Sequence, residues 1–149
     1  MTKKIDIKIR LAESRDAKQF LNLEALCFKM RLTGSTMYFW KPVVSYLWTY
    51  KATVNDRIVG GIIAMPTRDG DWYINSLFVH PRYRKHGIAT KLLKKIIGVV
   101  GKKRIFLDVK TDREHLVDFY GKHGFRRKKL MKNYYEDETD RYMLVRSKI

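Results

Sequence analysis

The 149-residue sequence has one cysteine, Cys27, and only three prolines. A single cysteine excludes a disulfide framework and a thiolate zinc cluster, and none of the four histidines has metal-ligand spacing, so we expect no metal site. The longest apolar run, residues 58–65, is far shorter than the ~20 residues that a membrane-spanning helix needs. The N-terminus lacks an apolar stretch of signal-peptide length, and neither end carries a lipidation signal. We therefore expect a cytoplasmic protein without a membrane partner.

Acidic residues are also scarce. Fifteen Asp and Glu face 32 Lys and Arg, giving a net charge of +17, and residues 75–149 hold 20 of those 32 cations. Hydrophobic residues make up 45% of the chain and aromatic residues 13%, which excludes a disordered protein. The charge predicts attraction to phosphates, whether on a nucleotide cofactor, a nucleic acid or a lipid headgroup, without choosing among them.

Hydrophobic periodicity predicts an α/β protein with a mostly antiparallel sheet. There is no internal repeat and no linker, so residues 1–149 are expected to form one domain. Ser14 is the expected N-cap of the first helix, Pro42 is expected in the first turn of the second, and 31–35 is expected to be a loop. The expected helices are 14–28, 36–50, 88–100 and 113–123, and the expected strands are 5–11, 51–54, 58–65, 72–79, 104–109, the segment from 125 onward, and 142–145.

A basic loop between a strand and a helix is the first candidate site. Residues 79–93 read VHPRYRKHGIATKLL, in which Arg84 and Lys85 precede Gly87 and a helix without acids. Unpaired backbone amides, the helix dipole and these cations together suit an anion, and a glycine lets the backbone approach a phosphate closely. The alternative is a solvated basic turn in which Gly87 only supports the bend.

This loop resembles the R-x-x-G-x-A motif of the GNAT acetyltransferases. Leu107-Asp108-Val109 followed by the segment 119–125, FYGKHGF, is similar to the second coenzyme A motif of that family. The resemblance spans about 5–145 and implies the GNAT fold, a single mixed, mostly antiparallel sheet of about seven strands flanked by about four helices. It also implies acetyl-CoA as cofactor, with the pyrophosphate on the loop amides and the pantetheine arm along the preceding strand. The implied cofactor-binding residues are Leu77, Phe78, Val79, Arg84, Lys85, His86, Gly87, Ile88, Ala89, Thr90, Arg113 and Tyr120.

Two of these residues need separate comment. Arg113 stands where the family often has an asparagine, so it is expected to meet a phosphate instead. Tyr120 has the family position of a general acid. A tyrosine, with a pKa near 10, stays protonated at neutral pH and can donate its proton to a departing thiolate. The alternative for Tyr120 is a core aromatic beside a glycine-capped helix.

Within the family, the chain resembles the N-terminal (α-amine) protein acetyltransferases, including the ribosomal-protein-alanine type. The segments that carry this resemblance are 24–28, EALCF, 73–77, YINSL, and 132–137, KNYYED. By position, they imply that an acceptor peptide meets Phe28, Asn75, Tyr134 and Tyr135. The alternative for the tyrosine pair is an exposed hairpin tip.

The group that deprotonates the amine has two candidates. Tyr73 is where one branch of these enzymes uses a tyrosine through water, and Asp108 stands where that branch has a histidine. Asp108 can accept the proton, or it is an ordinary strand residue or the partner of a lysine. An α-amine has a pKa near 8 and a lysine near 10.4, so at pH 7 about a tenth of α-amines but only about 0.04% of lysine amines are neutral. This difference favours an α-amine as acceptor.

The expected enzyme is therefore an acetyl-CoA-dependent N-acetyltransferase that acetylates the N-terminus of a protein or peptide by direct attack on the thioester. Cys27 has no histidine partner in the pattern and is expected to be a helix-core residue rather than a nucleophile. The alternatives are acetylation of a lysine or a small amine, and a nucleic-acid-binding module using Trp72, Tyr134 and Tyr135. The charge also allows nucleic-acid or ribosome contact, and we expect a monomer or weak homodimer.

Overall fold

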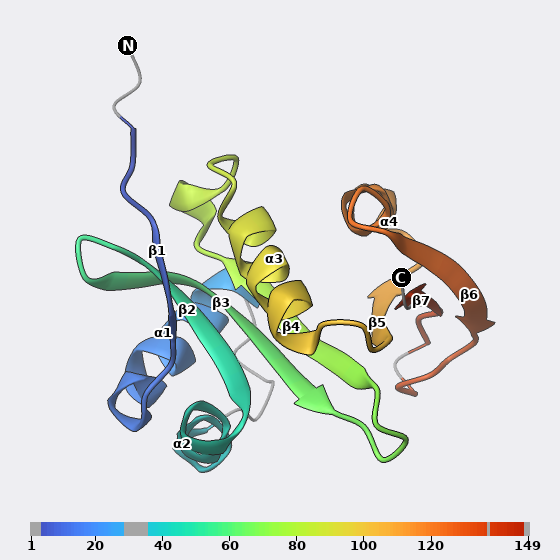
Figure 1. Cartoon of the computed structure of the whole chain (residues 1–149), viewed down its shortest axis with the longest axis horizontal. Helices are drawn as coiled ribbons and strands as arrows, with labels where there is room; N and C mark the ends of the chain where they lie inside the picture. The colour runs from blue at the N-terminus through green and yellow to red at the C-terminus, as the bar shows by residue number, and fades with distance from the viewer. Residues whose placement is uncertain (1–3, 29–35, 137, 148–149) are drawn as a thin grey trace. The chain divides into compact units, whose positions relative to one another are not determined.

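A computed structural model of the protein describes residues 4–28, 36–136 and 138–147 (Figure 1). Seven strands form a sheet in the order β1-β2-β3-β4-β5-β7-β6. The β4/β5 pair is parallel, whereas β1/β2, β2/β3, β5/β7 and β6/β7 are antiparallel. The expected mixed, mostly antiparallel α/β sheet is thus confirmed. The elements are β1 Lys8–Leu11, the 3₁₀ turn η1 Ser14–Asp16, α1 Ala17–Phe28, α2 Met37–Tyr46, β2 Trp48–Val54, β3 Arg57–Pro66, β4 Trp72–Val79, the 3₁₀ turn η2 Pro81–Tyr83, α3 Ile88–Val100, β5 Ile105–Lys110, α4 Glu114–Gly121, β6 Phe125–Met131 and β7 Arg141–Arg146.

The chain divides into two compact units. Unit 1 comprises Met1–Met65 and Asn75–Val99, and unit 2 comprises Pro66–Ile74 and Val100–Ile149. Strand β4 is divided between them, with residues 72–74 in unit 2 and residues 75–79 in unit 1. The single-domain organisation stays a prediction.

The core of unit 1 forms on both faces of β3. A Cβ atom on Gly60 would lie 3.1 Å from Ile88 Cγ2 of α3, whereas one on Gly61 would collide with the ring of Phe20 in α1. Successive residues of a strand point to opposite faces, so α3 and α1 pack against opposite faces of β3 at closest approach. The close packing explains why the buried strand carries two adjacent glycines.

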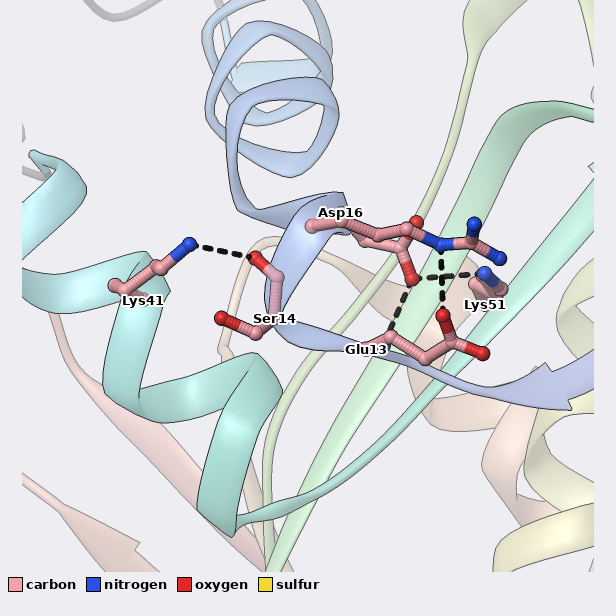
Figure 2. Close-up of polar contacts among 6 residues, drawn as sticks. Glu13, Ser14, Asp16, Lys41 and Lys51 are labelled. Carbon is pink, nitrogen blue, oxygen red and sulfur yellow. Dashed lines mark hydrogen bonds and ion pairs between the residues drawn. The ribbon is translucent and has the colours of Figure 1, made fainter.

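A buried ion pair joins the 3₁₀ turn η1, just before α1, to strand β2 (Figure 2). Lys51 Nζ lies 2.8 Å from Asp16 Oδ2, and the two side chains are only 10% and 6% exposed. The same carboxylate oxygen accepts the backbone N–H of Glu13 at 2.7 Å. This bond corrects the expectation that Ser14 is the N-cap: Ser14 is the first residue of η1, and Asp16 reaches back to the chain before it.

The segment 36–50 differs most from its prediction. Helix α2 ends at Tyr46 rather than at residue 50, and β2 begins at Trp48 rather than at 51. Tyr50 lies in the sheet because it pairs with Leu11 of β1 and Ile62 of β3, and this long-range pairing outweighs local propensity. Pro42 stands in the helix interior, not in its first turn.

A smaller difference lies at the first strand. Strand β1 begins at Lys8, three residues later than expected. The expected loop 31–35 lies outside the described residues. Across the parts of the chain that the structure describes, no helix combines the length and the apolar character needed to cross a bilayer.

Candidate active site

In unit 1, the basic loop connects β4 to α3 as expected. The first helical hydrogen bond runs from Lys91 N–H to Gly87 O at 3.0 Å, so the amides of residues 88–90 precede the first intrahelical donor. The backbone turns sharply here, since Lys85 has φ +65° and Gly87 has φ +78°. A Cβ built on Gly87 would meet no atom within 4 Å, which leaves open space beside these amides. This cradle fits a phosphate group.

Arg84 anchors the loop to the end of the strand. Its Nε donates to the Val79 carbonyl at 3.1 Å, and the same carbonyl lies 3.4 Å from Cys27 Sγ of α1. The Arg84 side chain therefore positions the loop through its Nε. Burial raises the pKa of the Cys27 thiol, which disfavours the nucleophilic thiolate.

Some predicted cofactor residues have side chains that belong to the core. Phe78 is buried and its ring lies 6.0 Å from those of Phe20, Phe28 and Trp40. Ile88 is also buried. These two residues can serve a cofactor only through backbone atoms, which is how the pantetheine arm and the pyrophosphate are expected to bind.

In unit 2, Tyr120 lies near the end of α4 and is 7% exposed. Its ring packs edge to face with Phe119 at 5.1 Å and Phe125 at 5.4 Å. Burial raises the pKa of the Tyr120 hydroxyl well above its usual range, so the group stays protonated at any physiological pH. Tyr120 is thus a core aromatic with a protonated hydroxyl, and its role as a general acid stays a prediction.

The most distinctive feature of unit 2 is a carboxylate shared by two tyrosines. Asp108 Oδ2 accepts from the Tyr135 hydroxyl at 2.6 Å and from the Tyr73 hydroxyl at 3.2 Å. These residues come from β5, from the segment between β6 and β7, and from β4, respectively. The structure therefore brings together the two candidate bases and one of the two tyrosines predicted to contact the acceptor. We call Tyr73, Asp108 and Tyr135 the carboxylate cluster.

Arg141 of β7 completes the surroundings of this cluster. Its Nη1 lies 3.7 Å from Asp108 Oδ1, and its guanidinium lies 4.7 Å from the centre of the Tyr135 ring. The sequence analysis did not single out Arg141. The sequence signal for Arg141 is only a cation at the start of the last strand. Its place beside Asp108 follows from the β5/β7 register: Arg141 pairs with Lys110, which is two residues from Asp108 on the same face of β5.

Burial and the carboxylate raise the pKa of both tyrosines in the cluster. For Tyr73 the main cause is desolvation, supported by the nearby charge of Asp108. For Tyr135 desolvation again comes first, followed by the hydrogen bond to Asp108. Both hydroxyls are therefore proton donors at neutral pH, and the carboxylate is the group in the cluster with acceptor capacity.

The remaining predicted residues are exposed or partly exposed. Tyr134 packs edge to face on Tyr135, with 4.8 Å between the ring centres. Arg113 lies at the N-cap position of α4 and its Nε is 3.8 Å from Asp112 Oδ1. In unit 1, Asn75 accepts a hydrogen bond from Ser76, and Phe28 is 44% exposed. Within the described residues, no cluster of His, Cys, Asp and Glu is arranged to hold a metal ion.

Comparison with known proteins identifies the family of this chain. The profile of the Acetyltransferase (GNAT) family matches residues 17–125. An uncharacterized N-acetyltransferase of Methanocaldococcus jannaschii is 30% identical over 145 residues, covering 94% of this chain and 91% of that protein. N-alpha-acetyltransferase 30 of Schizosaccharomyces pombe is 35% identical over 107 residues, covering 66% and 70%. The structure of Arabidopsis thaliana Naa50 with a bisubstrate analogue superposes with a TM-score of 0.79 at 26% identity, covering 96% and 99%.

Proposed function

Because this chain belongs to the GNAT acetyltransferase family and uses acetyl-CoA to acetylate an amine, we propose that its acceptor is the N-terminal α-amine of a protein or peptide. The observation that carries the proposal is the carboxylate cluster, in which a partly buried acid is flanked by two tyrosine hydroxyls. The names of the relatives, N-alpha-acetyltransferase 30 and Naa50, support the same acceptor.

The proton arithmetic also supports an α-amine. At pH 7 about a tenth of α-amines are already neutral, whereas a lysine would need its pKa lowered by some three units. One carboxylate, acting directly or through a water, is enough for the smaller task. Asp108 is the base in this proposal, since Tyr73 and Tyr135 hold their protons. Tyr73 orients the carboxylate and the amine.

Acetyl-CoA, when bound, would supply the activated thioester. The amides of residues 88–90 would hold its pyrophosphate, and the backbone of 77–79 would pair with the pantetheine arm. Asp108 would take the proton of the attacking amine, and Tyr120 would supply a proton to the departing sulfur. Transfer is direct in this proposal. The Cys27 thiol donates to the Val79 carbonyl and burial raises its pKa, so it is not an activated nucleophile. No other nucleophile with an activating base is present among the site residues.

The acceptor is tested with three peptides of one sequence that contains a single internal lysine. One has both amines free, one has a blocked N-terminus, and one has a blocked lysine. We expect turnover on the first and third peptides only, with a rate that rises with pH toward the α-amine pKa near 8 and then levels off. Equal turnover on the peptide with the blocked N-terminus would assign the protein to the lysine-acetylating enzymes.

The assignment of the base is tested by Asp108→Asn, with Tyr73→Phe for comparison. Asparagine still accepts hydrogen bonds from both tyrosines but cannot take a proton, so kcat should fall by roughly 10²–10⁴ with little loss of folding stability. Tyr73→Phe should cost less, because the base remains. A larger effect from Tyr73→Phe than from Asp108→Asn would make Tyr73 the base.

A further inference from the structure

Unit 2 carries an open groove of about 380 Å³ that the mechanism above does not use. We call it the basic groove, and it is lined by Arg104, Arg126, Arg127, Lys128, Val145 and Ser147. We propose that the basic groove binds acidic side chains of the acceptor polypeptide a few residues beyond its N-terminus. The inference rests on the proposed α-amine acceptor and names the class of polypeptide that this enzyme prefers.

Strand register places two residues of the basic groove, Arg126 and Val145, on the same face of the sheet as Asp108. Phe106 and Asp108 are two residues apart in β5, so their side chains share a face. Phe106 pairs with Val145, and Val145 pairs with Arg126 across the next strand boundary. Paired residues project to the same face. An acceptor peptide whose N-terminus lies at Asp108 can therefore reach Arg126 without crossing the sheet.

Two cations of the basic groove are available for a ligand. Arg104 is paired with Asp71 at 2.8 Å, and Arg127 with Glu114 at 3.1 Å. Arg126 and Lys128 are exposed, and among the described residues no acidic group lies within ion-pair distance of either. The groove therefore offers two uncompensated positive charges, which attract carboxylates.

The distance sets which acceptor residues reach the groove. Arg126 lies two strands across the sheet from Phe106, roughly 10 Å at about 4.8 Å per strand, and Phe106 lies two residues, roughly 7 Å, from Asp108. The separation of Arg126 from Asp108 is therefore roughly 12 Å. An extended peptide whose amine lies at Asp108 covers that span in about four residues. Acidic side chains at about positions 4–6 of the acceptor thus meet the groove.

The structure favours an acidic peptide over a nucleic acid as the occupant. Binding of single-stranded nucleic acid combines cations with open aromatic faces on which bases stack. None of the six residues that line the groove is aromatic, and the Arg104 guanidinium lies over one face of the neighbouring Phe106 ring at 5.3 Å. The groove lining therefore offers no ring on which a base can stack, whereas carboxylates need only the cations.

The test compares acceptor peptides that share their first three residues and carry three Glu, three Gln or three Lys at positions 4–6. Exposed ion pairs are individually weak, so we expect kcat/KM for the Glu peptide to exceed that for the Gln peptide by roughly 3- to 30-fold, mainly through KM. The preference should shrink as salt is raised, and the Lys peptide should be the poorest.

Matched variants assign the preference to the groove. Arg126→Ala with Lys128→Ala should abolish it, while turnover of the Gln peptide stays within about twofold of the parent enzyme. Lys8→Ala with Arg10→Ala removes an equal charge from exposed positions of the edge strand β1 and should keep the preference. Melting temperatures verify that both double variants fold.

The outcomes separate the two proposals. Equal kcat/KM for the Glu and Gln peptides, or a preference that survives Arg126→Ala with Lys128→Ala, overturns the groove proposal and leaves the α-amine acceptor intact. Failure to acetylate any free N-terminus overturns both. A flat peptide preference, together with binding of a single-stranded RNA that the groove variant weakens, assigns the groove to nucleic acid and also overturns the proposal.

Discussion

Replacing Gly87 by alanine tests the cofactor loop at the position where the structure makes the result easiest to interpret. Gly87 has φ +78°, and a Cβ there would touch no other atom of the protein within 4 Å. The added methyl group therefore cannot disturb packing. It acts in two ways only: it strains the local backbone, and it occupies the space where a phosphate would meet the loop amides.

Both effects have estimable sizes. An L-residue in the left-handed region costs about 1–2 kcal/mol, which for a chain of this length lowers Tm by roughly 2–8 °C. Losing one amide hydrogen bond to a charged phosphate costs about 1.5–3 kcal/mol, equivalent to roughly 10- to 150-fold weaker acetyl-CoA binding. The first effect belongs to the fold, and the second requires the ligand.

Gly101→Ala is the matched control. Gly101 follows α3 with φ +69° and also has no atom within 4 Å of a built Cβ, so it carries the same strain without a phosphate site. We expect both variants to lose similar Tm, and only Gly87→Ala to lose acetyl-CoA affinity by calorimetric titration. If Gly87→Ala binds acetyl-CoA as tightly as Gly101→Ala does, the loop does not hold the pyrophosphate.

Three further outcomes follow from the structure. Tyr120→Phe should lower kcat by roughly 10²–10⁴ in steady-state assays, and unchanged turnover would leave Tyr120 a packing residue. Because burial raises the pKa of Tyr120, the kcat of the parent enzyme should show no loss from ionisation of Tyr120 below pH 10. Cys27→Ala should change kcat less than twofold, whereas an acetylated Cys27 found by mass spectrometry would contradict direct transfer. Asp16→Ala should cost about 3–5 kcal/mol in urea unfolding because it leaves Lys51 buried without its partner, while Asp16→Leu with Lys51→Met should be close to neutral. An equal loss in the single and double variants would show that packing, not charge, dominates there.

The family, the glycine turn before α3 and most elements were predictable from local sequence. The pattern from Arg84 to Ala89 between a strand and a helix is short-range, and the backbone at Gly87 has the left-handed conformation that the glycine suggests. Period-two and helical spacing located most strands and helices within a few residues, since each reflects which face of a local segment is buried.

Local pattern failed where distant partners decided the structure. The segment after Tyr46 is aromatic, and its pattern predicts a continuing helix. Strand β2 begins at Trp48 instead, because β2 lies between two strand partners, β1 and β3. Pro42 is a different case, because a local contact decides it: the Thr36 side chain caps the helix by accepting the Tyr38 N–H, which leaves Pro42 in the helix interior.

The sequence alone determined which residue types are available: a glycine loop for an anion, a buried tyrosine, and two candidate bases in Tyr73 and Asp108. Only the tertiary structure decided how those bases differ. It joins the hydroxyls of Tyr73 and Tyr135 to one carboxylate and lays Arg141 beside it, so the tyrosines donate and Asp108 accepts. Residues 35 and 27 positions apart meet there because strand pairing fixes their register, and hydrogen-bond direction depends on that proximity, which no local spacing encodes.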